Sequence, residues 1–382
     1  MDLLFELLCQ FIDVSASCSL AKDFLKFKKM NSLTTTAEGT FLRNKIRGYA
    51  RDQRVECRMK AKDSLRIGLG QVKQEVAALE MGTKDVIGMA SRIKRRKHAT
   101  SEDLCRLSLG FLQGNDNINA FAAIPGAIQV LVKELTGPHI QRQTDAVECL
   151  CNLSLGEAHV SDKIVTLAGS YMVTYLDGKA ERLKRSCLWT LANILGTCEK
   201  AGRVLLQMQL LPKLWRLYSD PNGCQEDTAI CLSLVATHCL QHVSDEDRRY
   251  IAQNMPEKIP DQPGNEYFMY IVHQLEIVKQ EHKLGAQQAE YLVRFFEATL
   301  APPADRLSLI YGVRVMANLV ALGDPSLIGA LADPQNLVKT LNQLFVLRDP
   351  DLSLDSMRLL KNYLQLNVAD SNLLLDSLHI YA

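Results

Sequence analysis

The sequence predicts an all-α protein whose helices stack as repeats into a solenoid. Hydrophobic residues make up 47% of the 382 residues and aromatic residues only 6%. Leu, Ala and Val are abundant and β-branched runs are scarce, a balance that favours helices over sheets. Similar helical segments return about every 40 residues, and an asparagine returns with them at nearly one phase. This repetition is typical of units that bury their apolar faces only by stacking on their neighbours.

Residues 1–42 carry little signal, and we expect them to be poorly ordered or to form a short helix. Their apolar start lacks the basic region of a secretory signal, and no uncharged apolar run reaches the length of a membrane span. The 11 cysteines are an odd number, and several lie inside apolar helical patterns. We therefore expect reduced thiols in a cytoplasmic and nuclear protein.

The net charge of +1 is unevenly distributed along the chain. Residues 43–66 hold nine Lys and Arg against three acidic residues, and they open a basic leader that we place at 43–98. Helical spacing sets most of its cations in one stripe, namely Arg47, Arg51, Arg54, Arg58 and Lys62, with Lys60 beside it. Three interpretations of such a stripe are open: a solvated helix face, a contact to a polyanion or membrane surface, and a docking site for an acidic protein partner.

A second basic cluster lies near the end of the leader, where Lys94, Arg95, Arg96 and Lys97 are consecutive. Because four like charges repel one another in a packed element, we expect this run to be exposed and extended. Short basic runs of this kind serve as nuclear localisation signals or nucleic-acid patches, and they also occur in plain solvated linkers.

From residue 99 to residue 382 the chain is repetitive, and we expect about six or seven helical units. Helix-like segments follow Gly126, Gly169 and Gln209, which are 43 and 40 residues apart. Each is followed by a turn and then by a longer helical segment. The pattern is faint between residues 241 and 300 and returns in residues 314–324.

The longer segments carry the candidate binding residues. Their asparagines recur at one phase, with a serine in one place: Asn152, Asn193, Ser233, Asn318 and Asn362. Trp189 stands four residues before Asn193, so the two side chains are neighbours on one helical face. Two interpretations are open. Either Trp189 and the asparagines line a groove, or Trp189 belongs to the core and the asparagines bridge adjacent helices. Trp215 lies in an apolar helical pattern, and we expect it in the core.

These residues resemble armadillo repeats, in particular those of importin-α, in which the third helix of each repeat carries a Trp-x-x-x-Asn pair along a groove. The resemblance implies an armadillo-type solenoid in which Asn193 holds the backbone of an extended basic peptide, as donor and acceptor, and Trp189 forms a wall for a Lys or Arg. The leader, through Val55 to Asp63, is similar to the importin-β-binding segment of that family, and Lys94 to Lys97 stand where the family keeps an autoinhibitory cluster. Within the family, the chain is similar to divergent members named for transmembrane and coiled-coil segments.

The chain departs from that family at the tryptophan positions. Four residues before the recurring Asn or Ser stand Glu148, Trp189, Ala229, Arg314 and Arg358, so one Trp/Asn pair is complete. Glu148 would attract a basic peptide, whereas the two arginines would repel one. The expected groove therefore consists of Glu148, Trp189 and the recurring Asn and Ser residues.

Catalysis is not expected. The two cysteines of Cys149-x-Cys151 diverge on a helix and have no second Cys/His pair at zinc-site spacing, so we expect no metal and no cofactor. The sequence has no phosphate-binding glycine loop, and we expect no small-molecule substrate. Tyr49 is the only aromatic residue in 43–66, and the rest of the chain is acidic, which makes nucleic acid and membrane improbable partners.

We therefore predict a non-enzymatic adaptor in protein import into the nucleus. Its groove would bind basic-peptide cargo, and its leader would bind an importin-β-like carrier. The alternative is an armadillo scaffold for protein–protein interaction without a transport role.

Overall fold

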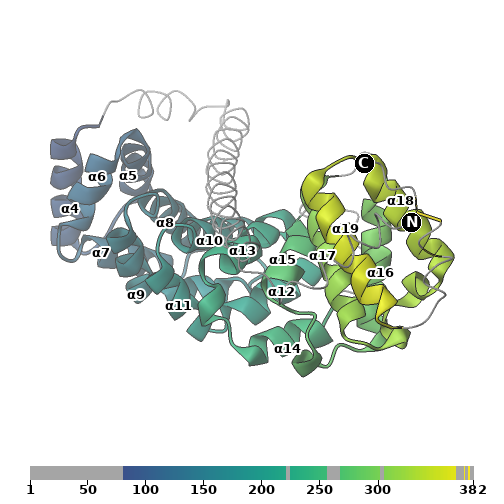
Figure 1. The fold of residues 1–382 in the computed structure, drawn as a ribbon. Coiled ribbons are helices and arrows are strands. Elements are labelled where there is room, and N and C mark those ends of the chain that lie inside the picture. The colour runs from purple at the N-terminus through teal and green to yellow at the C-terminus, as the bar shows by residue number, and fades with distance from the viewer. Residues whose placement is uncertain are drawn as a thin grey trace, which may run out of the picture. The chain divides into compact units, whose positions relative to one another are not determined.

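The computed structural model describes residues 81–220, 224–255, 267–301, 305–366, 374, 377 and 378. The expectations for 1–42 and for the basic stripe from Arg47 to Lys62 lie outside these ranges. Within them, the regular elements are helices (Figure 1). Taken singly, no helix in this part of the chain is long and apolar enough to span a membrane. The helices α6 (Asn115–Ala122) and α7 (Ala127–Leu135) meet that test only as a pair bent by 91°.

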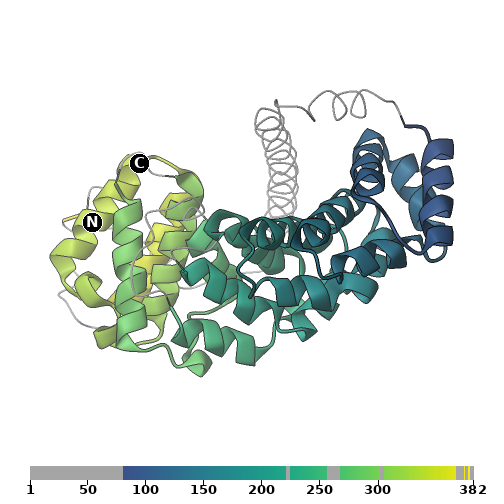
Figure 2. The ribbon, with the colours of Figure 1, turned by 180° about the vertical axis from the view of Figure 1, so that it is seen from behind.

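One row of helices runs through the described chain, and each member packs against the next one in sequence (Figures 1 and 2). We call them the third helices, because each closes one repeat. They are α5 (Ser101–Gln113), α8 (Ile140–Leu153), α10 (Glu181–Leu195), α13 (Gln225–His238), α15 (Phe268–Gln274), α17 (Arg306–Ala321) and α19 (Pro350–Leu364).

The remaining α-helices form the first and second positions of the repeats. They are α4 (Thr83–Arg96), α6 (Asn115–Ala122), α7 (Ala127–Leu135), α9 (Ala158–Tyr175), α11 (Glu199–Gln207), α12 (Leu210–Ser219), α14 (Asp245–Gln253), α16 (Ala286–Thr299) and α18 (Pro334–Val346). Short 3₁₀ turns lie at Leu240–His242, Gln280–His282, Pro325–Leu327 and Gly329–Ala332. This arrangement confirms the predicted fold class, an all-α solenoid of helical repeats.

Local sequence sets many of the helix ends. Thr100 accepts the main-chain N–H of Asp103, whose carboxylate in turn accepts the N–H of Thr100, and this reciprocal cap starts α5. Asp349 caps α19 in front of Pro350, which needs no hydrogen bond at the first helical position. Gly126, with φ of 89°, makes the sharp turn between α6 and α7.

The expected start of a helix after Gly169 is wrong. The structure has one continuous helix, α9, across that position, so the first and second helices of this repeat are fused. A β-carbon on Gly169 would make an ordinary van der Waals contact with Leu205 of α11, at 3.5 Å, so the glycine lies on the face of α9 that packs on α11. Gly169 inside the helix thus marks a packing contact and not a helix boundary.

The faint part of the repeat pattern is held together by aromatic packing. Trp215 is buried, as predicted, with 1% of its surface exposed. Its ring stacks 6.2 Å from Phe268 of α15, which in turn packs 4.5 Å from Phe295 of α16. The short helix α15 therefore takes the place of a third helix although its seven residues are too few to show a clear period.

Helix α4 packs directly against α5, α6 and α7, so the boundary that we expected between residues 98 and 99 is not a boundary in the structure. The buried face of α4 consists of Val86, Met89, Ala90 and Ile93. The solenoid thus includes the last part of the segment that we had assigned to the leader.

The basic cluster at Lys94 to Lys97 is exposed, as expected, but it is not extended. Lys94, Arg95 and Arg96 form the last turn of α4, and Lys97 caps the helix in the left-handed conformation. The expectation of an extended run is wrong because Ile93 and its buried neighbours anchor the helix. The helix dipole also favours cations at the C-terminal end.

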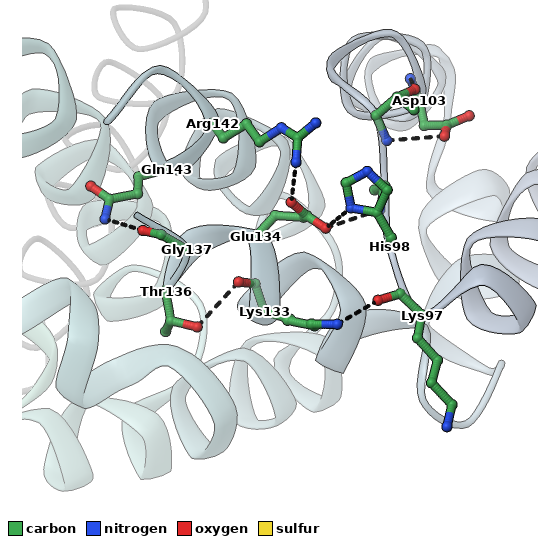
Figure 3. Close-up of polar contacts among 11 residues, drawn as sticks. Lys97, His98, Asp103, Lys133, Glu134, Thr136, Gly137, Arg142 and Gln143 are labelled. Carbon is green, nitrogen blue, oxygen red and sulfur yellow. Dashed lines mark hydrogen bonds and ion pairs between the residues drawn. The ribbon is translucent and has the colours of Figure 1, made fainter. Parts of the chain in front are cut away.

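Glu134 of α7 fastens the connection between α4 and α5 (Figure 3). Its buried carboxylate lies 2.6 Å from Nδ1 of His98 and accepts the main-chain N–H of Ala99 at 3.1 Å. Arg142 of α8 lies 3.4 Å from the other oxygen. Lys133 adds a bond to the carbonyl of Lys97 at 3.0 Å. These contacts fix the segment that connects the exposed C-terminal end of α4 to α5.

Candidate functional site

The candidate site is the face of the third helices that carries the Trp/Asn positions. We call it the ladder. Its first set of positions holds Glu148, Trp189, Ala229, Arg314 and Arg358, and its second set holds Asn152, Asn193, Ser233, Asn318 and Asn362. The structure places these residues in order on α8, α10, α13, α17 and α19.

Three ladder asparagines join successive third helices. The side-chain amide of Asn152 donates to the carbonyl of Ser108 on α5 at 3.0 Å. Asn193 donates to the carbonyl of Cys151 on α8 at 3.0 Å, and Asn362 donates to that of Ala317 on α17 at 2.8 Å. Each bond reaches back one repeat, so these asparagines stabilise the stacking. These asparagines therefore bridge adjacent helices, which is one of the roles that the sequence left open for them.

The other two positions of the second set differ. Ser233 is buried, and its hydroxyl donates to the carbonyl of Ile230 in its own helix at 2.8 Å. Asn318 is exposed on α17. Asn152 is only 4% exposed, whereas Asn193 and Asn362 are partly exposed. The single phase seen in the sequence thus corresponds to several environments.

Trp189 is half-buried, and its indole is held by the next repeat. Nε1 donates to Oδ1 of Asp227 on α13 at 2.7 Å, and Nε of Arg185 lies 3.2 Å from Oδ2 of the same carboxylate. Burial raises the pKa of Asp227, and the two donors only partly offset this effect. Burial lowers the pKa of Arg185, but Asp227, Cys224 and Glu181 together outweigh it and the net shift is upward.

Glu148 has a partner of opposite charge. Nη2 of Arg182 on α10 lies 2.8 Å from Oε1 of Glu148 on α8. Both side chains are partly exposed, at 63% for Arg182 and 36% for Glu148, so solvent screens the pair. The attraction of Glu148 for a basic peptide is reduced accordingly.

At the C-terminal end of the ladder, two arginines share one buried carboxylate. Nε of Arg314 lies 2.6 Å from Asp355 on α19, and Nη1 of Arg358 lies 3.5 Å from it. The guanidinium of Arg314 also lies over the ring of Tyr311, 5.0 Å from its centre. Asp227 and Asp355 were missed in the sequence because their partners Trp189 and Arg314 lie on another helix. Tyr311 was missed although its partner Arg314 lies on the same helix. A search for acidic residues one repeat away from Trp189 and Arg314 would have found both carboxylates.

The buried thiols show no sign of reactivity. Burial raises the pKa of Cys149, Cys187 and Cys231, so these groups stay protonated at neutral pH and are poor nucleophiles and metal ligands. Within the described ranges, no group of three or more His, Cys, Asp or Glu side chains is placed to hold a metal ion.

No family model matches the chain. Among solved structures, it is similar to an engineered protein of the Northeast Structural Genomics Consortium, with a TM-score of 0.57 and 19% identity over 73% of this chain and 68% of that one. Computationally designed armadillo repeat proteins for modular peptide recognition align with a TM-score of 0.42 and 18% identity over 73% of this chain and 99% of theirs. A designed armadillo repeat protein in complex with the peptide (KR)4 aligns with a TM-score of 0.40 and 17% identity over 74% and 100%.

At 19% identity, the likeness to the first engineered protein shows a common fold and no more. The other two structures, with TM-scores below 0.5, are too distant to extend it. The chain is thus a solenoid of helical repeats.

Proposed function

We propose that this chain is a non-enzymatic protein-binding adaptor that holds an extended protein segment along its third helices. One observation carries the proposal: Trp189 and Asn193 stand four residues apart on α10, and both are partly exposed between buried neighbours. Asp227 holds the indole and Cys151 holds the amide. A ligand therefore meets two side chains whose orientations are already set, which lowers the entropy lost on binding.

The hydrogen bonds refine the role of Asn193. Its Nδ2 donates to the carbonyl of Cys151 at 3.0 Å and to Oγ of Ser154 at 3.1 Å, which uses both of its hydrogens. Towards a peptide Asn193 would act through Oδ1, as an acceptor for a main-chain N–H. The expectation that it serves as donor and acceptor at once is corrected in this respect. Trp189 would cover the aliphatic stem of a Lys or Arg beside that N–H.

The finer proposal is a role in protein import into the nucleus. It is supported by the resemblance to importin-α and by the basic stripe from Arg47 to Lys62, which would bind an importin-β-like carrier. In this role the protein would be present in cytoplasm and nucleus. The cluster Lys94 to Lys97 would enter its own groove as an extended peptide only if the last turn of α4 unwound, and Ile93 and Glu134 oppose this.

A specific observation favours the alternative, a scaffold without a transport role. Two acidic groups on the third helices already have cationic partners, because Glu148 pairs with Arg182 and Asp227 pairs with Arg185. A basic localisation signal would compete with these arginines. A segment with apolar and uncharged side chains would not.

The central experiment measures binding of a fluorescein-labelled basic peptide to the full chain by anisotropy. We expect Trp189→Ala combined with Asn193→Ala to weaken binding about tenfold or more, because a wall and an acceptor are lost together. Tyr171→Ala is the matched control, since Tyr171 is an exposed aromatic residue on α9 that is not one of the ladder positions. Unchanged affinity in a double variant that still melts cooperatively would remove the groove assignment.

Deletion of residues 43–66 separates the two roles. An import adaptor loses its importin-β-like carrier in a pull-down with purified proteins, and charge reversal of the five striped residues has the same effect. A scaffold retains its partners after the deletion.

A further inference from the structure

The C-terminal end of the ladder repeats the geometry of the Trp189 site with a different chemistry. Arg314 and Asn318 stand four residues apart on α17, and Arg358 and Asn362 stand four residues apart on α19. The two helices pack against each other along their length. An arginine thus occupies the tryptophan position on two successive third helices, each followed by its asparagine.

The two ladder arginines keep one uncompensated positive charge, whereas Arg306 and its two carboxylates at the start of α17 and α19 carry a net charge of −1. Arg314 and Arg358 share Asp355, which is 4% exposed, and the three groups together carry a net charge of +1. The two carboxylates at the start of α19, Asp349 and Asp351, lie 2.6 and 2.9 Å from Arg306. The side chain of Arg358 remains 58% exposed at 3.5 Å from its partner, so it has donors that face solvent.

A histidine next to the arginines experiences the same field. The ring of His273 on α15 lies 5.4 Å from Tyr311, and its buried Nδ1 has no hydrogen-bond partner. The pKa of His273 is lowered to about 4, chiefly by burial and also by the charges of Arg314 and Arg358, against a weaker opposite effect of Glu276. The ring is therefore neutral at pH 7 and leaves the positive charge to the arginines.

We propose that the Arg314/Asn318 and Arg358/Asn362 pairs bind an extended acidic protein segment rich in Asp and Glu. The guanidinium of Arg358 would bind a carboxylate of the segment, and Asn318, exposed on the neighbouring helix, would hold its main chain. Arg314 is held in place by Tyr311 and Asp355, and its positive charge would add to the attraction for the acidic segment.

The observations favour a peptide over a nucleic acid as the occupant. Single-stranded nucleic acids bind on open aromatic faces that stack against the bases. The tyrosines at this end are covered, because Tyr270 is 9% and Tyr311 is 3% exposed, and the two rings pack edge to face at 4.9 Å. Arginine and asparagine at helical spacing remain, and they match carboxylates and a peptide main chain.

The test uses the full chain and a short fluorescein-labelled peptide of Asp and Glu, with a lysine-rich peptide and oligo(U) as further probes. We expect Arg358→Glu to weaken binding of the acidic peptide about tenfold, because one charge-assisted hydrogen bond is lost and a repulsion is added. Arg294→Glu is the matched control, because Arg294 on α16 is 57% exposed and is also paired within its own helix. Its effect should stay below about twofold. Arg358→Gln replaces Arg358→Glu if the latter does not melt cooperatively.

Two results would overturn the inference: acidic-peptide binding that is insensitive to both Arg358 variants, or oligo(U) binding that is tighter and equally sensitive to them. The inference rests on the proposed use of the third helices as a binding face, and the two can fail separately. Loss of basic-peptide binding on changing Trp189, without any effect at Arg358, would retain the proposed function and reject this site. An effect at Arg358 with none at Trp189 would do the reverse.

Discussion

The indole of Trp189 on α10 donates to the buried carboxylate of Asp227 on α13, 38 residues later in the chain, at 2.7 Å. One side chain therefore both faces the proposed peptide site and joins two successive repeats. Arg185 holds the other oxygen of that carboxylate at 3.2 Å. Because removal of one partner leaves a buried charge less compensated, binding and stability are linked at this position.

Replacement of Trp189 by Phe separates the two roles. The variant keeps an aromatic face but loses the N–H that binds Asp227, so the free energy of unfolding should fall by about 1–3 kcal/mol. Affinity for a basic peptide should fall much less than in Trp189→Ala. Urea denaturation and peptide anisotropy measure the two quantities. Equal loss of affinity in the Phe and Ala variants would assign binding to the N–H.

The asparagines of the ladder should differ in their effect on stability. Asn193→Ala removes two hydrogen bonds to α8 and its C-terminal end and should lower the free energy of unfolding by about 1–3 kcal/mol. Asn318→Ala, at an exposed position of the same phase, should change it by less than about 0.5 kcal/mol. Equal losses in the two variants would contradict the bridging role of Asn193.

Glu134 should control the attachment of α4. Glu134→Gln removes a charge that accepts the N–H of Ala99 and lies beside His98 and Arg142, and it should destabilise the chain by about 1–3 kcal/mol. Hydrogen exchange should become faster in α4 before it changes in α10. Glu102→Gln is the control, because Glu102 is 72% exposed. Uniform acceleration along the whole solenoid would argue against a local attachment.

His273 predicts a loss of stability in acid. Its pKa is lowered to about 4 in the folded chain, chiefly by burial, whereas the unfolded chain takes up this proton near the ordinary value of 6.5. As the pH falls from 7 to 5, only the unfolded state gains the proton, which disfavours folding by roughly 1–2 kcal/mol. His273→Gln should reduce this part of the pH dependence of the melting temperature. His159→Gln, with a side chain that is 51% exposed, serves for comparison.

Replacement by alanine should change the free energy of unfolding in opposite directions at two helical glycines. A β-carbon on Gly312 of α17 would lie 2.6 Å from the ring of the buried Phe296, so Gly312→Ala should cost about 1–3 kcal/mol through overpacking. A β-carbon on Gly88 of α4 meets nothing within 4 Å, so Gly88→Ala should add about 0.5–1 kcal/mol through helix propensity. Thermal melts of the two variants measure both effects, and a stabilised Gly312→Ala variant would contradict the packing of α17 on α16.

Periodicity predicted the longer elements well and the short ones poorly. The asparagine phase located α8, α10, α17 and α19, because an amphipathic helix of about four turns shows its period within one segment. Helix α15 was not predicted, because seven residues surrounded by aromatic packing show no such period. The single helix α9 was divided in error, because Gly169 was interpreted as a boundary when it lies on the face of α9 that packs on α11.

The candidate site could be predicted as a set of positions but not as a set of interactions. The residues of the ladder were identified from their spacing, since spacing along a helix is a local property. Their partners were not, because Asn193 bonds to Cys151 and Arg314 to Asp355, 42 and 41 residues away.

Composition and period were thus sufficient for the class of fold, the repeat length and the burial of Trp215. Only the tertiary structure established three other features: the ion pairs of the binding face, the fixed indole of Trp189 and the helical form of Lys94 to Arg96. The physical reason is that each feature depends on which helix packs beside which. A hydrogen bond or buried ion pair forms only when stacking brings a donor atom of one repeat within about 3 Å of an acceptor atom of the next.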